Sequence, residues 1–353
     1  KDPGIGVIRL TGFAIGTTLA SGIFSLSGDM AANGAGTAAI LLGWFICGIG
    51  MMALMMCFYN LNKLRPDLTS GIYSYAKEGF GDYVGFNSAW GYWISALLAN
   101  VSFATLLFAA LGYFFPIFGV GNNLASVLCA SVLIWFTVYL VMRGVNEATT
   151  INLVVVIAKV MPILVLIVAI IFAKAFDPAI FMHNFMEGPA GLSFMDQVKA
   201  TIYTTVWVFV GIEGAVVISG RARNTRDAGR ATVISFLSLF AIYLMISILS
   251  MGVMTAGELG ALGNPPMAGV LEAVVGPWGA ALVNLAVVVS LGGATFTYTI
   301  LSAESAYAPA IKGSFPKIFA LENGKKAPSG SLIITNVAIQ IFLIIVLFNE
   351  STY

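Results

Sequence analysis

Nine apolar runs, each long enough to cross a lipid bilayer, constrain this chain more than any other feature of its sequence. A helix that spans the hydrocarbon core needs about 20 mainly apolar residues. In lipid the backbone must satisfy its own hydrogen bonds, so we expect these runs to be helices. The runs cover residues 7–28, 37–59, 86–113, 125–142, 150–173, 200–219, 232–254, 278–303 and 330–348. The sequence therefore predicts an all-α protein that crosses a membrane many times.

The composition excludes several classes of protein. Charged residues make up only 9% of the chain, against about 25% in a soluble domain. The net charge is +1 and the basic residues form no single stripe, so we expect no nucleic-acid partner. The three cysteines lie inside apolar runs and His183 is the only histidine, so we expect no His/Cys metal site and no cofactor.

Lysine and arginine residues predict the orientation, because they accumulate in cytoplasmic loops. If the N-terminus is cytoplasmic, 14 of the 17 basic residues face the cytoplasm, while Lys174 and Lys199 lie outside and Lys159 lies within a span. The 14 residues are Lys1, Arg9, Lys63, Arg65, Lys77, Arg143, Arg221, Arg223, Arg226, Arg230, Lys312, Lys317, Lys325 and Lys326. We therefore expect a multi-pass protein of the cell membrane with its N-terminus in the cytoplasm.

Two of the spans carry residues that weaken a helix. Residues 16–24 read Gly-Thr-Thr-Leu-Ala-Ser-Gly-Ile-Phe, and residues 207–214, in the sixth span, read Trp-Val-Phe-Val-Gly-Ile-Glu-Gly. Such breaks are tolerated in a membrane only where they are buried in protein or line a cavity. Breaks at corresponding places in two halves indicate a transporter built from inverted repeats. We expect one transmembrane domain over 1–353, with a first repeat at about 7–173 and an incomplete second repeat at about 200–348.

Unwound segments offer a site for a zwitterion. Free N–H groups near Thr18, Ser21 and Gly22 could hold a carboxylate at a half-helix N-terminus. Free carbonyls near Trp207 and Val210 could hold an ammonium group. Small residues at these spacings also allow close helix packing, and this alternative stays open.

Two ionisable residues lie deep in predicted spans, where a charge is costly and suggests a role. Lys159 precedes Pro162, which should loosen the helix so that the ammonium can reach carbonyls freed by the first break. It could act as a fixed cation or a proton carrier, or simply be satisfied by carbonyls. Glu213 could carry a proton or tie its helix to neighbouring helices.

The third span has one polar face. On it lie Tyr92, Ser95, Ala96, Asn100 and Phe103, at three- and four-residue steps. Asn100 is an amide deep in this apolar run and should face protein or a cavity. A hydrogen bond between helices is the alternative. In the eighth span, glycines and hydroxyls at residues 290–298 could line a path, although this signal is weak alone.

These motifs resemble those of the amino acid–polyamine–organocation transporters, particularly their basic amino acid antiporters. Residues 20–22 are similar to the family's Gly-Ser-Gly carboxylate loop, and residues 207–213 to its Trp-x-Phe-x-Gly-x-Glu segment. Residues 70–76 and 313–316 are similar to its cytoplasmic loops. Residues 85–93 and 209–214 most resemble the branch that exchanges arginine for ornithine.

The resemblance implies a LeuT-like fold of five-plus-five inverted repeats with discontinuous helices 1 and 6. Members have about twelve spans, so we expect the nine spans here to belong to a longer protein. The resemblance places the substrate carboxylate at Thr18, Ser21 and Gly22, and its ammonium at the carbonyls of Trp207 and Val210. The implied side-chain pocket, in which no carboxylate faces the cation, comprises Ser95, Ala96, Asn100, Phe103, Trp207 and Tyr298. Tyr92 belongs to the same face, and Lys159 matches a lysine that replaces sodium in some members.

The implied function is exchange of a cationic amino acid for a related amino acid or its amine product, by alternating access. Proton-coupled symport, histidine/histamine exchange and lysine/cadaverine exchange remain alternatives. An enzyme is not expected, because the spans hold no paired carboxylates, His/Cys cluster or serine–base pair. A channel would need a charged ring or repeated filter, which the sequence lacks. The expected partners are a small amino acid or amine and the lipid bilayer, and a homodimer is a possible assembly.

Overall fold

The computed structural model describes residues 4–185 and 192–348. Lys1 and the polar tail at 349–353 lie outside the described residues. Within that part the regular elements are helices, and one isolated parallel bridge pairs Ile5 with Ala222.

Seven long apolar helices coincide with seven of the predicted runs, and each is long enough to cross a membrane. Continuous stretches of apolar residues form them because helical hydrogen bonds satisfy the backbone in an apolar surrounding. They are α3 (Thr37–Leu64), α5 (Asp82–Leu111), α6 (Leu124–Met142), α7 (Val145–Phe172), α11 (Arg226–Val253), α14 (Pro277–Ile311) and α15 (Ser329–Val346). The described chain is therefore a multi-pass helical protein.

The first predicted span is broken where its glycines, threonines and serine lie. It forms α1 (Val7–Thr18) and α2 (Gly22–Ala32), bent by 42° at the break. Counted as one span, the pair raises the number of described spans to eight. The predicted break at residues 16–24 is confirmed.

The sixth predicted run, 200–219, is not one continuous helix. It comprises the end of α9 (Phe194–Trp207), a turn, and the short α10 (Gly214–Val217). Gly211 has a φ of +98°, which a helix cannot contain and which glycine adopts most readily. Because of this unwinding the run does not count as a membrane-length helix, so the described helices give eight spans rather than nine.

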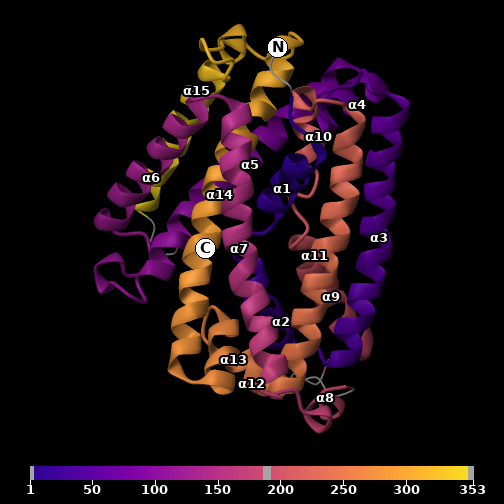
Figure 1. Cartoon of the computed structure of the whole chain (residues 1–353), viewed down its shortest axis with the longest axis vertical. Coiled ribbons are helices and arrows are strands. Elements are labelled where there is room, and N and C mark those ends of the chain that lie inside the picture. The colour runs from indigo at the N-terminus through magenta and orange to yellow at the C-terminus, as the bar shows by residue number, and fades with distance from the viewer. Residues whose placement is uncertain (1–3, 186–191, 349–353) are drawn as a thin grey trace.

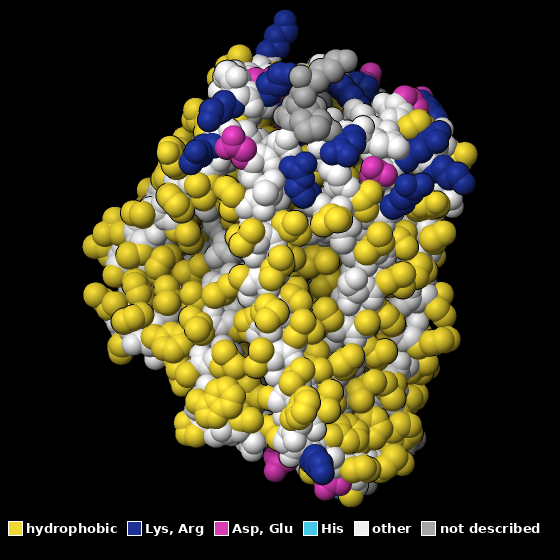
Figure 2. Space-filling view, viewed as in Figure 1, with side chains coloured by type: hydrophobic (Ala, Val, Ile, Leu, Met, Phe, Trp, Pro, Cys, Tyr) yellow, Lys and Arg dark blue, Asp and Glu magenta, His cyan; other side chains and the backbone are white. Residues whose placement is uncertain are grey.

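Short helices cap the two ends of the molecule (Figure 1). The end near the N-terminus carries α4 (Ile72–Phe80) and α10, and the opposite end carries α8 (Pro178–His183), α12 (Ala256–Ala261) and α13 (Pro266–Val275). Three 3₁₀ turns cover Pro116–Phe118, Ser219–Arg221 and Lys317–Ala320. Figure 2 shows hydrophobic side chains along the middle of one face, while Lys and Arg gather at the end near the N-terminus. This distribution is typical of a protein embedded in a bilayer.

The first broken helix lies inside the bundle. Its half α1 packs against α7, α11 and α14, while α2 packs against α12 and α13. Helix α14 runs along α5, and α3 packs against α9 and α11 (Figure 1). The break between α1 and α2 is therefore surrounded by helices from distant parts of the chain.

Candidate functional site

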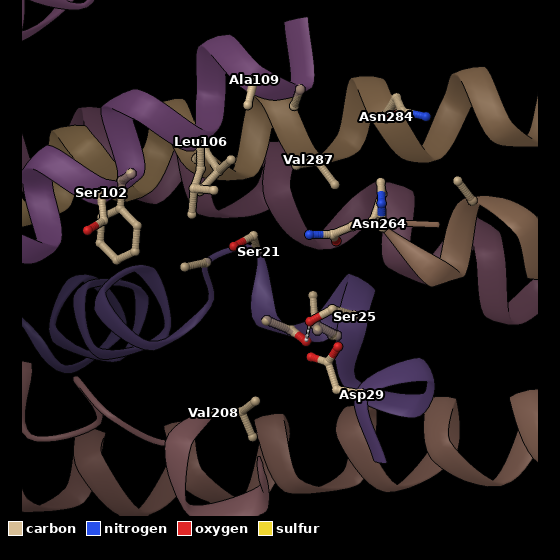
Figure 3. Close-up of a pocket in the computed structure, with 18 of the residues that line it drawn as sticks. Ser21, Ser25, Asp29, Ser102, Leu106, Ala109, Val208, Asn264, Asn284 and Val287 are labelled. Atoms are coloured by element: carbon tan, nitrogen blue, oxygen red, sulfur yellow. Dashed lines mark hydrogen bonds between the residues drawn. The ribbon is translucent and has the colours of Figure 1, made fainter. Parts of the chain in front are cut away.

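A cavity of about 1000 Å³ begins at the first break and extends toward the end of the molecule that carries α12 and α13. Its lining comes from α1, α2, α5, α9, α11, α13 and α14. Figure 3 shows Ser21 facing Leu106 across this space, with Ser25 and Asp29 further along α2. Toward the α12–α13 end the lining includes exposed side chains of Tyr113, Asn264 and Glu272.

The first break presents a helix N-terminus to the cavity. Helix α2 begins at Gly22, and both Ser21 and Gly22 line the cavity. The first N–H groups of a helix have no carbonyl partner inside it, and they carry a partial positive charge. The hydroxyl of Ser290 donates to the carbonyl of Ala20 at 2.9 Å, which ties the break to α14. This end of α2 is suited to an anionic group such as a carboxylate.

The second break faces the first. The hydroxyl of Thr17 donates to the carbonyl of Gly211 at 2.6 Å. A Cβ placed on Gly22 would lie 3.3 Å from Val208 Cγ1 and 3.9 Å from Trp207 Nε1. The Trp207 side chain lines the cavity and is 69% exposed, so its indole is available to a bound molecule. The two unwound segments thus meet at one end of the cavity.

Eight of the eleven substrate-site residues predicted from the sequence line this cavity. They are Thr18, Ser21, Gly22, Ser95, Phe103, Trp207, Val210 and Tyr298. The rings of Phe103 and Tyr298 pack edge to face at 4.9 Å between centroids.

The other three predicted residues do not line the cavity. Tyr92 donates its hydroxyl to Glu213 Oε1 at 2.8 Å, and Ala96 is buried. Asn100 is fully buried and its amide lies 3.4 Å from Thr299 Oγ1 on α14. The structure therefore places Asn100 at a contact between helices, the alternative that its sequence context leaves open.

Two carboxylates line the cavity, although the pocket expected from the sequence contains none. They belong to Asp29 on α2 and Glu272 on α13. Of the lining residues that the structure describes, none is Lys, Arg or His. Asp29 could have been found from its spacing, because Ser21, Ser25 and Asp29 follow the break at four-residue steps on one helix face. The described lining is therefore acidic and attracts cations.

Lys159 reaches the first break as its sequence position predicts. It is fully buried on α7, and its Nζ donates to the carbonyl of Gly16 at 3.0 Å. A Cβ on Gly293 would lie 2.9 Å from Lys159 Cε, so the lysine stem needs this glycine on α14. The ammonium thus supports the last turn of α1 from outside the cavity lining.

A cluster of contacts closes the opposite end of the molecule. Arg221 pairs with the buried Glu304 at 3.0 Å and with Glu322 at 3.5 Å. Its guanidinium also lies 4.9 Å from the ring centroid of Tyr307. The N–H of Ile5 donates to the carbonyl of Arg221 at 3.0 Å. These contacts join the start of the chain, the 3₁₀ turn after α10, and the end of α14.

Comparison with known proteins gives concordant matches. The model of the amino acid permease family matches residues 5–353. An arginine/ornithine antiporter of Pseudomonas aeruginosa is 46% identical over 97% of this chain and 70% of its own length. A putative arginine/ornithine antiporter of Escherichia coli K12 is 41% identical over 99% of this chain and 76% of its own. An arginine/agmatine antiporter of Chlamydia caviae is 40% identical over 99% and 73% respectively.

A solved structure supports the fold independently. The substrate-bound outward-open state of a Na⁺-coupled sialic acid symporter matches with a TM-score of 0.64 over 98% of this chain and 74% of that one. The sequences are 12% identical, so the likeness concerns the fold alone.

Proposed function

This chain belongs to the amino acid permease family, and from that premise we propose that it exchanges a cationic amino acid for a related amino acid or its amine product. It is a membrane transporter and not an enzyme. The names of the matched relatives favour arginine/ornithine or arginine/agmatine exchange over the histidine/histamine, lysine/cadaverine and symport alternatives.

The observation that carries the proposal is the meeting of both broken helices at one end of an acidic cavity. The N-terminus of α2 at Ser21 and Gly22 suits the substrate carboxylate. Carbonyls at Trp207 and Val210 suit its α-ammonium group. The rest of the cavity has room for a long side chain, and its lining carboxylates favour a positive charge on that chain.

We propose a LeuT-like arrangement of five-plus-five inverted repeats for the fold. The first repeat runs over about 7–173 and the second over about 200–348, within a single transmembrane domain. In this arrangement the α9–α10 segment is a ninth, discontinuous span equivalent to the α1–α2 pair. Support comes from the position of the two breaks, five predicted spans apart, and from the bond between them.

We propose that the N-terminus is cytoplasmic. The concentration of Lys and Arg at that end of the molecule supports this orientation (Figure 2). The cavity then faces the outside, and the Arg221 cluster closes the cytoplasmic side. Opening to the cytoplasm requires the two broken helices to move relative to the surrounding bundle.

The proposal is tested by exchange in proteoliposomes loaded with unlabelled arginine and presented with a panel of labelled amino acids and amines. We expect uptake of arginine and of ornithine or agmatine, and little uptake of alanine or glutamate. Preferential uptake of neutral or acidic amino acids would contradict the proposed substrate class.

A further inference from the structure

We propose that Asp29 is the residue that selects a cationic side chain, by binding the guanidinium or ammonium end of a substrate whose α-carboxylate lies at the N-terminus of α2. The inference deepens the proposed function and rests on it.

Asp29 lies on the cavity face of α2. Ser21, Ser25 and Asp29 all line the cavity, and they succeed one another at the four-residue step that keeps residues on one face of a helix. Side chains of a helix lean toward its N-terminus. Figure 3 shows the Asp29 carboxylate directed back toward Ser25 and thus toward the first break.

The spacing matches the length of a cationic amino acid. Asp29 is seven residues beyond Gly22, which corresponds to about 10 Å along the helix axis. Because the side chain leans back toward the helix N-terminus by roughly 3–4 Å, its carboxylate lies roughly 6–8 Å from the start of α2. In extended arginine the five bonds from Cα to the guanidinium carbon span about 6–7 Å, given bonds of about 1.5 Å. A substrate held by its carboxylate at Gly22 therefore reaches Asp29 only if its side chain is long.

Asp29 has no cationic partner within the described chain. The ion pairs of the described residues do not include it, and no lining residue is basic. A carboxylate within a membrane-spanning pair of helices is costly and marks a functional position by default. A cationic substrate supplies the missing charge, and a charge-assisted hydrogen bond forms where the lining offers no other basic group.

Other polar groups are less suited to this role. Asn100, the amide expected in the side-chain pocket, is buried against Thr299 and away from the cavity. Asp29 and Glu272 are both exposed, but Glu272 belongs to α13, beside Asn264 at the end of the cavity away from the first break, whereas Asp29 follows that break on α2. We therefore place Glu272 at the mouth of the cavity and Asp29 beside the bound substrate.

The test compares arginine with citrulline, a neutral isostere of nearly the same size. Binding of each to purified protein is measured by competition with labelled arginine, for the unmodified protein, Asp29→Asn, Asp29→Glu and Glu272→Gln. In the unmodified protein arginine should bind much more tightly than citrulline. Asp29→Asn should weaken arginine binding by about 10- to 100-fold, the range expected for a lost hydrogen bond to a charged group. Citrulline binding should change by less than about threefold, within the scatter of neutral contacts.

The companion variants separate selectivity from structure. Asp29→Glu keeps the charge and should retain a clear preference for arginine, and Glu272→Gln should lower the ratio of arginine to citrulline affinity by less than Asp29→Asn does. The assignment of Asp29 is overturned if Asp29→Asn keeps the ratio of arginine to citrulline affinity of the unmodified protein. It is also overturned if both Asp29→Asn and Asp29→Glu weaken the binding of arginine and citrulline equally. If the unmodified protein binds neither arginine nor ornithine, the proposed function fails instead.

Discussion

Thr17 and Gly211, 194 residues apart, join the two broken helices through a hydrogen bond of 2.6 Å from the threonine hydroxyl to the glycine carbonyl. The same hydroxyl lies 3.0 Å from the carbonyl of Ala14 and 3.1 Å from that of Phe13, so the contact across the breaks is the shortest. A Cβ on Gly214 would lie 2.5 Å from this oxygen. The two unwound segments are therefore in direct contact, and a displacement of one must displace the other.

Replacing Thr17 with Val should weaken this connection. The substitution removes one of two donors to the Gly211 carbonyl, which keeps the N–H of Gly214 at 3.0 Å, so the loss is that of one hydrogen bond, about 0.5–1.5 kcal/mol. We expect a lower Tm and slower exchange. Thr232→Val is the matched control, because the Thr232 hydroxyl bonds the carbonyl of Ala228 in its own helix. Equal effects of the two substitutions would show that the contact between breaks has no special role.

Replacing Gly211 with Ala should lower the thermal stability by more than the backbone conformational penalty alone. A Cβ at Gly211 would lie 2.5 Å from the Thr17 carbonyl oxygen, and the φ of +98° is unfavourable for alanine. Gly313→Ala supplies the control, since Gly313 has a φ of +79° with open space around its Cβ position. A positive φ costs alanine about 1–3 kcal/mol. Thermal unfolding should show a clearly larger loss for Gly211→Ala, and similar losses would contradict the close approach of the two breaks.

Trp207 and Asn100 should respond differently to alanine. Trp207 faces the cavity, so Trp207→Ala should weaken arginine binding by about 3- to 30-fold through loss of an aromatic face for the cation. Asn100→Ala should alter Tm more than affinity, because Asn100 is buried beside Thr299 and does not line the cavity. Isothermal titration with arginine measures the affinity of each variant, and a thermal melt measures its Tm. A large loss of arginine affinity in Asn100→Ala with an unchanged Tm would indicate that Asn100 contacts the substrate.

Lys159 should influence the rate of transport. Lys159→Met retains much of the stem but removes the donor to Gly16, so the end of α1 loses its support from α7. We expect exchange to slow by about tenfold, corresponding to roughly 1.4 kcal/mol for one charged hydrogen bond. Rates measured from pH 5 to 9 show whether the ammonium also sets the pH dependence. Unchanged rates at every pH would remove Lys159 from the mechanism.

The sequence predicts the breaks and the long helices because both depend on local chemistry. Apolar runs without interruption form α3, α5 and α7, and the glycine-rich stretches at residues 16–24 and around Gly211 unwind. The contact of Lys159 with the first break is also predicted, because a buried ammonium must find acceptors.

Side-chain directions across the bundle could not be predicted in the same way. Asn100 shares a helix face with Ser95 and Phe103, yet only those two reach the cavity. Which part of a face is covered depends on the packing of α14 along α5, which is a tertiary property. Asp29 could not be assigned to the site from sequence, because a charged residue near the end of a predicted span is usually solvated, and only the structure places it in the cavity lining.

Counterflow in proteoliposomes tests the central claim, exchange through the cavity between the two breaks, most directly. Labelled arginine is presented to vesicles that are empty, loaded with ornithine, or empty with an imposed inward proton gradient. We predict rapid uptake of labelled arginine only into the ornithine-loaded vesicles. The same uptake should be strongly reduced in the Trp207→Ala and Gly211→Ala variants. Equal uptake into empty vesicles driven by the proton gradient would contradict exchange and indicate a symporter.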